Sequence, residues 1–174
     1  NQAAATLALM AAADGIKPEM IEKGVIWTNT RATEYAGVDC SGPFYSTTQA
    51  KMSQQYTFAA LLTYGKPVND AFKDYSNDTI TRLASVLELR ARTEYDAIYP
   101  KRMQGAVELY LVNGEMKKYQ IEEARYYDYT DIDEGFDYYL SKAFDTNRVA
   151  RIKDMIDNIE SLNSISELAR LLAI

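Results

Sequence analysis

Residues 46–65 read STTQAKMSQQYTFAALLTYG. Ser46 and Gln49 have the spacing of a capping box, in which a serine and a glutamine side chain accept backbone N–H groups at the start of a helix. Apolar residues follow at helical intervals, and Gly65 is a common residue just past a helix C-terminus. The segment therefore predicts one helix that runs from residue 46 to about residue 64.

Residues 105–114 read GAVELYLVNG, an alternating pattern that is typical of a strand with one buried face. The dipeptide Asn113-Gly114 is typical of a type I′ turn, in which both central residues have positive φ. Residues 117–121 can form the returning strand. This part of the chain therefore predicts a β-hairpin.

The rest of the chain predicts further elements around these two segments. Helices are expected at residues 2–14, 69–75, 78–84, 132–144, 147–160 and 164–172, and strands at 25–30 and 87–91. Residues 31–45 lack periodicity and predict a long loop. Asp131 with Glu134 is expected to cap the helix at 132–144. These elements indicate the α+β class: a mainly antiparallel sheet with flanking helices, followed by C-terminal helices.

Composition limits the classes of protein to which the chain can belong. Its 174 residues carry a formal net charge of -6 and predict one domain, or one domain with an appendage. No segment approaches the ~20 apolar residues of a membrane-spanning helix, so no membrane partner is expected. An acidic chain without a basic stripe is unsuited to binding nucleic acid. The single cysteine, Cys40, excludes an internal disulfide and fits a reducing compartment, and a cytoplasmic location is expected.

The chain contains no histidine, which excludes Ser–His and Cys–His nucleophile pairs and most zinc sites within it. It has neither a glycine-rich phosphate loop nor a CxxC motif, so no cofactor and no metal are expected. The acidic residues at 128–134 lack the glycine and terminal glutamate of an EF-hand, and we interpret them as helix-start carboxylates. Cys40 is interpreted as an inert buried side chain.

Lys51, Ser53 and Tyr56 are candidates for ligand binding within the predicted helix at 46–64. Ser53 and Tyr56 lie three residues apart and share one stripe of a helix. A helix N-terminus and a lysine both attract anions, so the run predicts binding of a carboxylate. The alternative interpretation is an ordinary capped helix with a solvated lysine.

Tyr35, in the predicted loop, is a candidate proton donor or acceptor. A tyrosine has an unperturbed pKa of about 10. It would need either a lowered pKa to act as a base or a role as an acid. The alternative interpretation is a tyrosine at the surface or in an interface.

The order and spacing of these motifs resemble the C-terminal half of the MmgE/PrpD family, the 2-methylcitrate dehydratase-like enzymes. One matching run is Thr47-x-x-Ala50-Lys51-x-Ser53-x-x-Tyr56, followed by Ala60-Leu61-Leu62 and Gly65. The segment from Tyr99-Pro100 to Gly114 is similar to a later strand and hairpin of the family, and residues 133–172 are similar to its closing helices.

The resemblance implies a two-domain enzyme of which this chain is one part. Residues 1–125 resemble a small α+β lid, and residues 126–174 resemble helices that return to a large helical domain. The active site of the family lies between the two, and its histidines and aspartate come mostly from the N-terminal part. The first lid helix in the family often opens with histidine, where this chain has Asn1. The N-terminal helical domain is therefore an expected partner, and the family also implies a homodimer.

The function implied is that of a lyase of the hydro-lyase class, in propionate catabolism. It would dehydrate a small di- or tricarboxylate such as 2-methylcitrate by acid/base proton transfer next to a carboxylate. Tyr35 would be catalytic, and Lys51, Ser53 and Tyr56 would bind substrate. Decarboxylation and epimerisation are alternatives within the family. The residues alone also leave open a non-catalytic α+β binding or interaction module. With the main acid and base elsewhere, the isolated chain is expected to be inactive.

Overall fold

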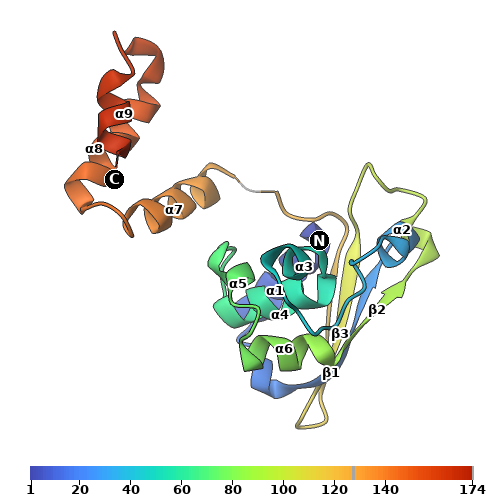
Figure 1. Cartoon of the computed structure of the whole chain (residues 1–174). Coiled ribbons are helices and arrows are strands. Elements are labelled where there is room, and N and C mark those ends of the chain that lie inside the picture. The colour runs from blue at the N-terminus through green and yellow to red at the C-terminus, as the bar shows by residue number, and fades with distance from the viewer. Residues whose placement is uncertain (127, 174) are drawn as a thin grey trace. The chain divides into compact units, whose positions relative to one another are not determined.

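The computed structural model describes residues 1–126 and 128–173 and contains one four-stranded mixed sheet (Figure 1). The strand order is β2-β1-β3-β4, in which β1 pairs with β2 in parallel and the other neighbours are antiparallel. The strands are β1 (Ile21–Thr28), β2 (Leu87–Ala91), β3 (Gly105–Leu111) and β4 (Met116–Ile121). The predicted α+β class with a mainly antiparallel sheet is confirmed. The parallel pair requires a crossover, which residues 29–86 supply.

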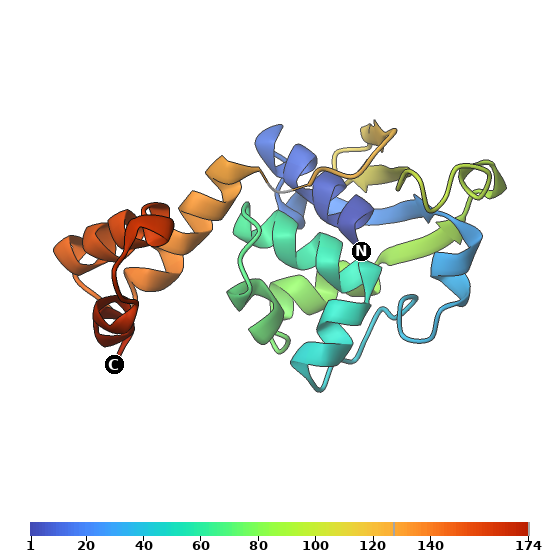
Figure 2. The ribbon, with the colours of Figure 1, turned by 90° about the horizontal axis from the view of Figure 1, so that it is seen from above.

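Helices flank the sheet, with α4 packed between α1 and α6 (Figures 1 and 2). The helices of this part are α1 (Gln2–Ala13), α2 (Thr30–Glu34), α3 (Thr47–Met52), α4 (Gln54–Tyr64), α5 (Asp70–Lys73) and α6 (Asp78–Ser85), with 3-10 turns at Pro18–Met20 and Thr93–Tyr95. The core includes Leu7, Ile26, Phe58, Ile80 and Leu109, all of them fully buried or nearly so. In α4 every residue from Gln54 to Leu62 is buried, so this helix is the centre of the domain.

The predicted single helix at residues 46–64 is wrong, because the chain breaks into α3 and α4 at Ser53. Ser53 has extended backbone angles and serves as the C-terminal cap of α3 and the N-terminal cap of α4. The predicted loop at 31–45 also needs correction, since its start is helical. Asn29 caps α2 there by accepting a hydrogen bond from the backbone N–H of Ala32.

The hairpin between β3 and β4 is confirmed, but its turn is not type I′. Gly114 has a φ of 86°, whereas no described non-glycine residue has positive φ. The Gly114 N–H donates to the Leu111 carbonyl, and the Leu111 N–H donates to the Glu115 carbonyl. The loop therefore has three residues and ends in a left-handed glycine.

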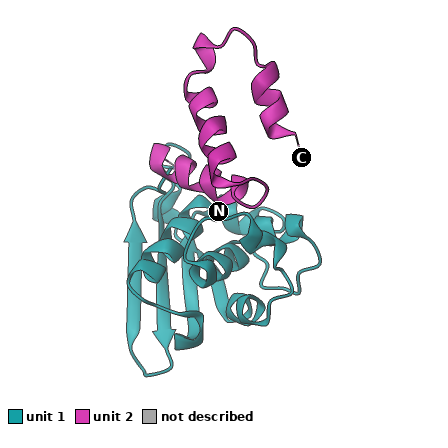
Figure 3. Cartoon of the chain, turned by 90° about the vertical axis from the view of Figure 1, so that its left-hand side faces the viewer, with its two compact units in different colours: residues 1–126 teal, residues 127–174 magenta. Residues whose placement is uncertain are grey.

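The chain divides into two compact units, Asn1–Tyr126 and Tyr127–Ile174 (Figure 3). The second unit contains α7 (Tyr129–Leu140), α8 (Thr146–Asp157), a 3-10 turn (Ile159–Ser161) and α9 (Ser166–Leu172). Its small core is formed by Ile152, Met155 and Leu168.

The N-terminal cap of α7 differs from the predicted one. Asp128 and Asp131 form the capping box, in which each carboxylate accepts the backbone N–H of the other residue at 3.0 Å. The capping pair therefore lies one turn closer to the N-terminus than the expected pair of Asp131 and Glu134. Within the described chain, no helix has the length and apolar character needed to cross a membrane.

Candidate functional site

The break between α3 and α4 brings together several polar groups, and we call residues 51–57 the helix junction. Ser53 is fully buried at its centre. The Ser53 Oγ accepts the backbone N–H of Tyr56 at 2.9 Å and donates to the Cys40 carbonyl at 2.5 Å. This single hydroxyl therefore starts α4 and anchors the loop that precedes α3.

Two further contacts tie the same loop to the helix junction. The Gln54 N–H donates to the Val38 carbonyl at 3.0 Å. The Gln55 side chain donates to Asp39 Oδ1 at 2.5 Å and accepts from the Cys40 N–H at 3.3 Å. Both glutamines are buried although they lie in the central helix. The backbone N–H of Gln54 and the side-chain amide of Gln55 supply the hydrogen bonds that an irregular loop needs when it packs against a buried helix.

Asn1 contacts the helix junction from the start of α1. Its Nδ2 donates to the Lys51 carbonyl at 2.6 Å and to the Met52 carbonyl at 2.9 Å. These carbonyls belong to the last turn of α3, where intrahelical partners are missing. The family resemblance implies that this helix often opens with histidine, where the present chain has Asn1-Gln2. A side-chain amide donates hydrogen bonds but is not a titratable acid or base.

Lys51 is exposed on α3, and its Nζ lies 5.9 Å from the centroid of the Phe72 ring. This distance is within the range of a cation–π contact, which leaves the ammonium group open to an anion. Because the backbone carbonyl of Lys51 is held by Asn1, the residue sits on a fixed part of the helix junction. The predicted role in binding substrate stays a prediction.

Tyr56 is fully buried, and its hydroxyl donates to the Ala71 carbonyl at 2.9 Å. Its ring packs edge-on against Phe44, with 4.8 Å between the centroids. Burial, together with the nearby Asp74 and Tyr64, raises the pKa of Tyr56 well above its usual range. The hydroxyl is therefore neutral at physiological pH and holds α5 against α4. Its predicted contact with substrate, like that of Ser53, is untested.

Tyr35 follows α2 directly, and 65% of its surface is exposed. Asp96 fixes the start of α2, because its carboxylate accepts the Thr30 N–H at 2.8 Å and the Thr30 hydroxyl at 2.6 Å. These hydrogen bonds hold the pKa of Asp96 below its usual range. The Tyr35 carbonyl accepts the Val38 N–H at 3.1 Å, which connects Tyr35 to the loop held by the helix junction.

The structure thus places the four predicted residues on one connected region but in different environments. Ser53 and Tyr56 are bonded to each other inside the domain, whereas Lys51 and Tyr35 are exposed. Sequence reasoning missed the parts played by Asn1 and by the glutamines at 54 and 55. The available signal was a polar run within an otherwise apolar helix. Among the residues described, no three His, Cys, Asp or Glu side chains group as metal ligands.

Comparison with models of protein families identifies the C-terminal domain of a known family in this chain. A sequence model described as the MmgE/PrpD C-terminal domain matches residues 2–161, which include the helix junction, the whole sheet and α7 and α8. None of the curated proteins is significantly similar to the chain.

Proposed function

Because the chain belongs to the MmgE/PrpD family and carries its C-terminal domain, we propose that it is the C-terminal part of a lyase that acts on a small di- or tricarboxylate such as 2-methylcitrate. The proposed reaction is dehydration by proton transfer next to a carboxylate. The main acid and base come from an N-terminal helical domain, since this chain has no histidine.

The observation that carries the proposal for the site is the exposed Lys51 on the rigid helix junction. Because Asn1 holds the backbone carbonyl of Lys51, the position from which the side chain extends is fixed, and the ammonium group can form a charge-assisted hydrogen bond with a substrate carboxylate. In this proposal Ser53 and Tyr56 act from inside, by setting the position of Lys51 and of the loop. Tyr35 extends from that loop as the candidate proton donor, in keeping with its exposed side chain.

The second unit supports a role within a larger enzyme. Its core is small, while large apolar side chains such as Ile132, Ile159 and Ile165 are 58%, 47% and 65% exposed. Several large apolar side chains exposed on one unit indicate a surface that another part of a protein covers. We therefore propose that α7, α8 and α9 complete the helical domain of the enzyme.

The test compares the chain alone with the chain plus the N-terminal helical domain, against a panel of di- and tricarboxylates. We expect no turnover by the chain alone and turnover of 2-methylcitrate by the combined sample. Product analysis separates dehydration from decarboxylation and epimerisation. Turnover by the chain alone would overturn the proposed division of the site. A combined sample that neither binds nor converts any of the acids would favour an interaction module.

In the active sample, Lys51→Met is expected to raise KM by about tenfold or more, because a charge-assisted hydrogen bond contributes roughly 1.5–3 kcal/mol. Lys117→Met is the matched control, since Lys117 is an exposed lysine on β4. Equal KM values for the two variants would show that Lys51 does not bind the substrate.

A further inference from the structure

An open groove of about 800 Å³ runs between α7 and α8 of the second unit. On α8 its lining residues fall at positions 146, 149, 150, 153, 154 and 157, and on α7 and its C-terminal cap at 134, 137, 138 and 141. Both sets follow the i, i+3, i+4, i+7 spacing of one helical stripe. The groove therefore runs along both helices, a shape that suits a third helix.

The lining of the groove combines apolar and acidic side chains. Val149, which is buried, and Ala150 supply apolar surface. Four carboxylates also line it, from Glu134, Asp137, Asp154 and Asp157.

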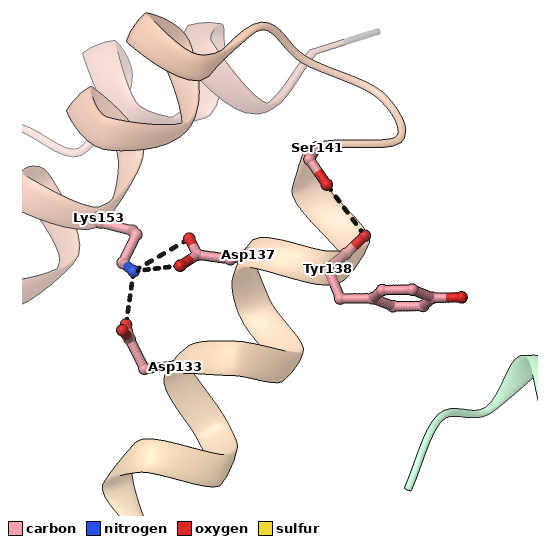
Figure 4. A network of polar contacts seen from close by, with 5 residues as sticks. All are labelled: Asp133, Asp137, Tyr138, Ser141 and Lys153. Atoms are coloured by element: carbon pink, nitrogen blue, oxygen red, sulfur yellow. Dashed lines mark hydrogen bonds and ion pairs between the residues drawn. The ribbon is translucent and has the colours of Figure 1, made fainter. Parts of the chain in front are cut away.

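Lys153 is the one cationic side chain among the described lining residues, and it is already paired. Its Nζ lies 2.6 Å from Asp133 and 3.0 Å from Asp137 (Figure 4). The hydrogen bonds that the Lys153 ammonium group donates to these two carboxylates raise the pKa of Lys153. Within the described residues, Glu134, Asp154 and Asp157 have no ion-pair partner, so the groove retains an excess of negative charge.

We propose that this groove receives a cationic amphipathic helix from the N-terminal helical domain of the enzyme. Small apolar residues of that helix would face Val149 and Ala150, and its Lys or Arg side chains would pair with Glu134 and Asp157. The proposal rests on the proposed function and adds the chemistry of the partner. It agrees with the composition of the second unit, in which residues 128–173 contain ten Asp and Glu but five Lys and Arg.

The probe is a synthetic amphipathic peptide of about 14 residues, a length at which helix formation in water becomes feasible. It carries Leu and Ala on one face and Lys on the other, and a second peptide has Glu in place of Lys. Binding to the full chain is measured by fluorescence anisotropy and mapped by the amide NMR signals of Val149 and Ala150. We expect the Lys peptide to bind and to shift these signals, and the Glu peptide to do neither.

Asp157→Lys is expected to weaken binding of the Lys peptide about tenfold, which corresponds to about 1.4 kcal/mol. Glu160→Lys is the matched control, because it makes the same charge change three positions away at an exposed residue outside the groove. A lysine at the C-terminus of α8 agrees with the helix dipole, so the variant should fold.

Equal binding by the two peptides, or equal loss in the two variants, would overturn the proposal. Self-association of the chain that Asp157→Lys abolishes would also overturn it, by making a second copy the occupant. No substrate is involved, so failure here is separable from failure of the turnover test.

Discussion

Ser53 performs two structural tasks through one hydroxyl group, as the N-terminal cap of α4 and as a donor to the Cys40 carbonyl. Removing the hydroxyl leaves the N–H of Tyr56 and the partly buried carbonyl of Cys40 without this partner. These two hydrogen bonds explain why Ser53 interrupts a segment whose sequence pattern predicts one continuous helix.

We expect Ser53→Ala to lower the free energy of unfolding by about 2–3 kcal/mol, as the sum of a lost helix cap and a lost hydrogen bond to the Cys40 carbonyl. Ser46→Ala is the control, because Ser46 caps α3 from an exposed position. Its cost should be about 1 kcal/mol. Urea denaturation measures both, and equal costs for the two variants would contradict the dual role of Ser53.

Tyr56 should make stability depend on alkaline pH. The unfolded chain releases the phenol proton at a pKa of about 10, whereas the folded chain retains it to higher pH because the pKa is raised. Stability from this group is therefore present below pH ~10 and is lost as pH rises above it.

Tyr56→Phe tests this dependence. At neutral pH the variant should be less stable by about 1 kcal/mol, because the Ala71 carbonyl loses its partner. The difference in stability between the two proteins should shrink as pH rises above ~10. Only the unsubstituted chain has a phenol at this position, and this phenol ionises on unfolding. A difference that stays constant with pH would show that Tyr56 ionises equally in both states.

At the scale of helices and strands, two glycines should respond in opposite ways to the same substitution. Gly114 has a φ of 86°, and a Cβ added there would meet open space, so Gly114→Ala meets only backbone strain. Gly135 lies inside α7, where an added Cβ would also meet open space.

We expect Gly114→Ala to destabilise the first unit by about 1–2 kcal/mol, and Gly135→Ala to stabilise α7 by about 0.5–1 kcal/mol. Circular dichroism during thermal unfolding reports both effects. A loss of helix content in Gly135→Ala would mean that α7 makes a contact at this position that requires the absence of a side chain.

The sequence was most informative where a pattern is local and repeated. The alternation at 105–111 predicted β3 correctly, and the apolar spacing predicted α8. It failed at Ser53, because the residue three positions on is tyrosine rather than the Glu or Gln of a capping box.

The candidate site was harder to predict than the fold. The burial of Ser53 and Tyr56 depends on the loop at 38–40 and on α5, which pack against the helix junction from elsewhere in the chain. Such contacts leave no periodic signal. The contact between Asn1 and the end of α3 likewise joins segments distant in sequence.

At the scale of the whole molecule, the first unit has the features of an independent folding domain. Its end returns to its beginning, because Ala124 is buried and the Arg125 N–H donates to the Thr6 hydroxyl at 3.0 Å. The core and the sheet both lie within residues 1–126.

We therefore expect residues 1–126, expressed alone, to unfold cooperatively at nearly the same denaturant concentration as the corresponding transition of the full chain. Near-ultraviolet circular dichroism and urea titration check this. A shortened chain without a cooperative transition would show that the second unit is needed for the first to fold.

The position of β1 inside the sheet has a consequence for the order of events during synthesis. Gly24 pairs with Leu87 on one side and with Leu109 on the other, so both partners of this early strand leave the ribosome late. Long-range pairing of this kind slows folding, because a large loop must close before the contact is made. Until β3 has been synthesised, the backbone of β1 lacks one of its two neighbouring strands. The nascent chain is most vulnerable to aggregation in that interval, because strand edges and apolar side chains are then exposed.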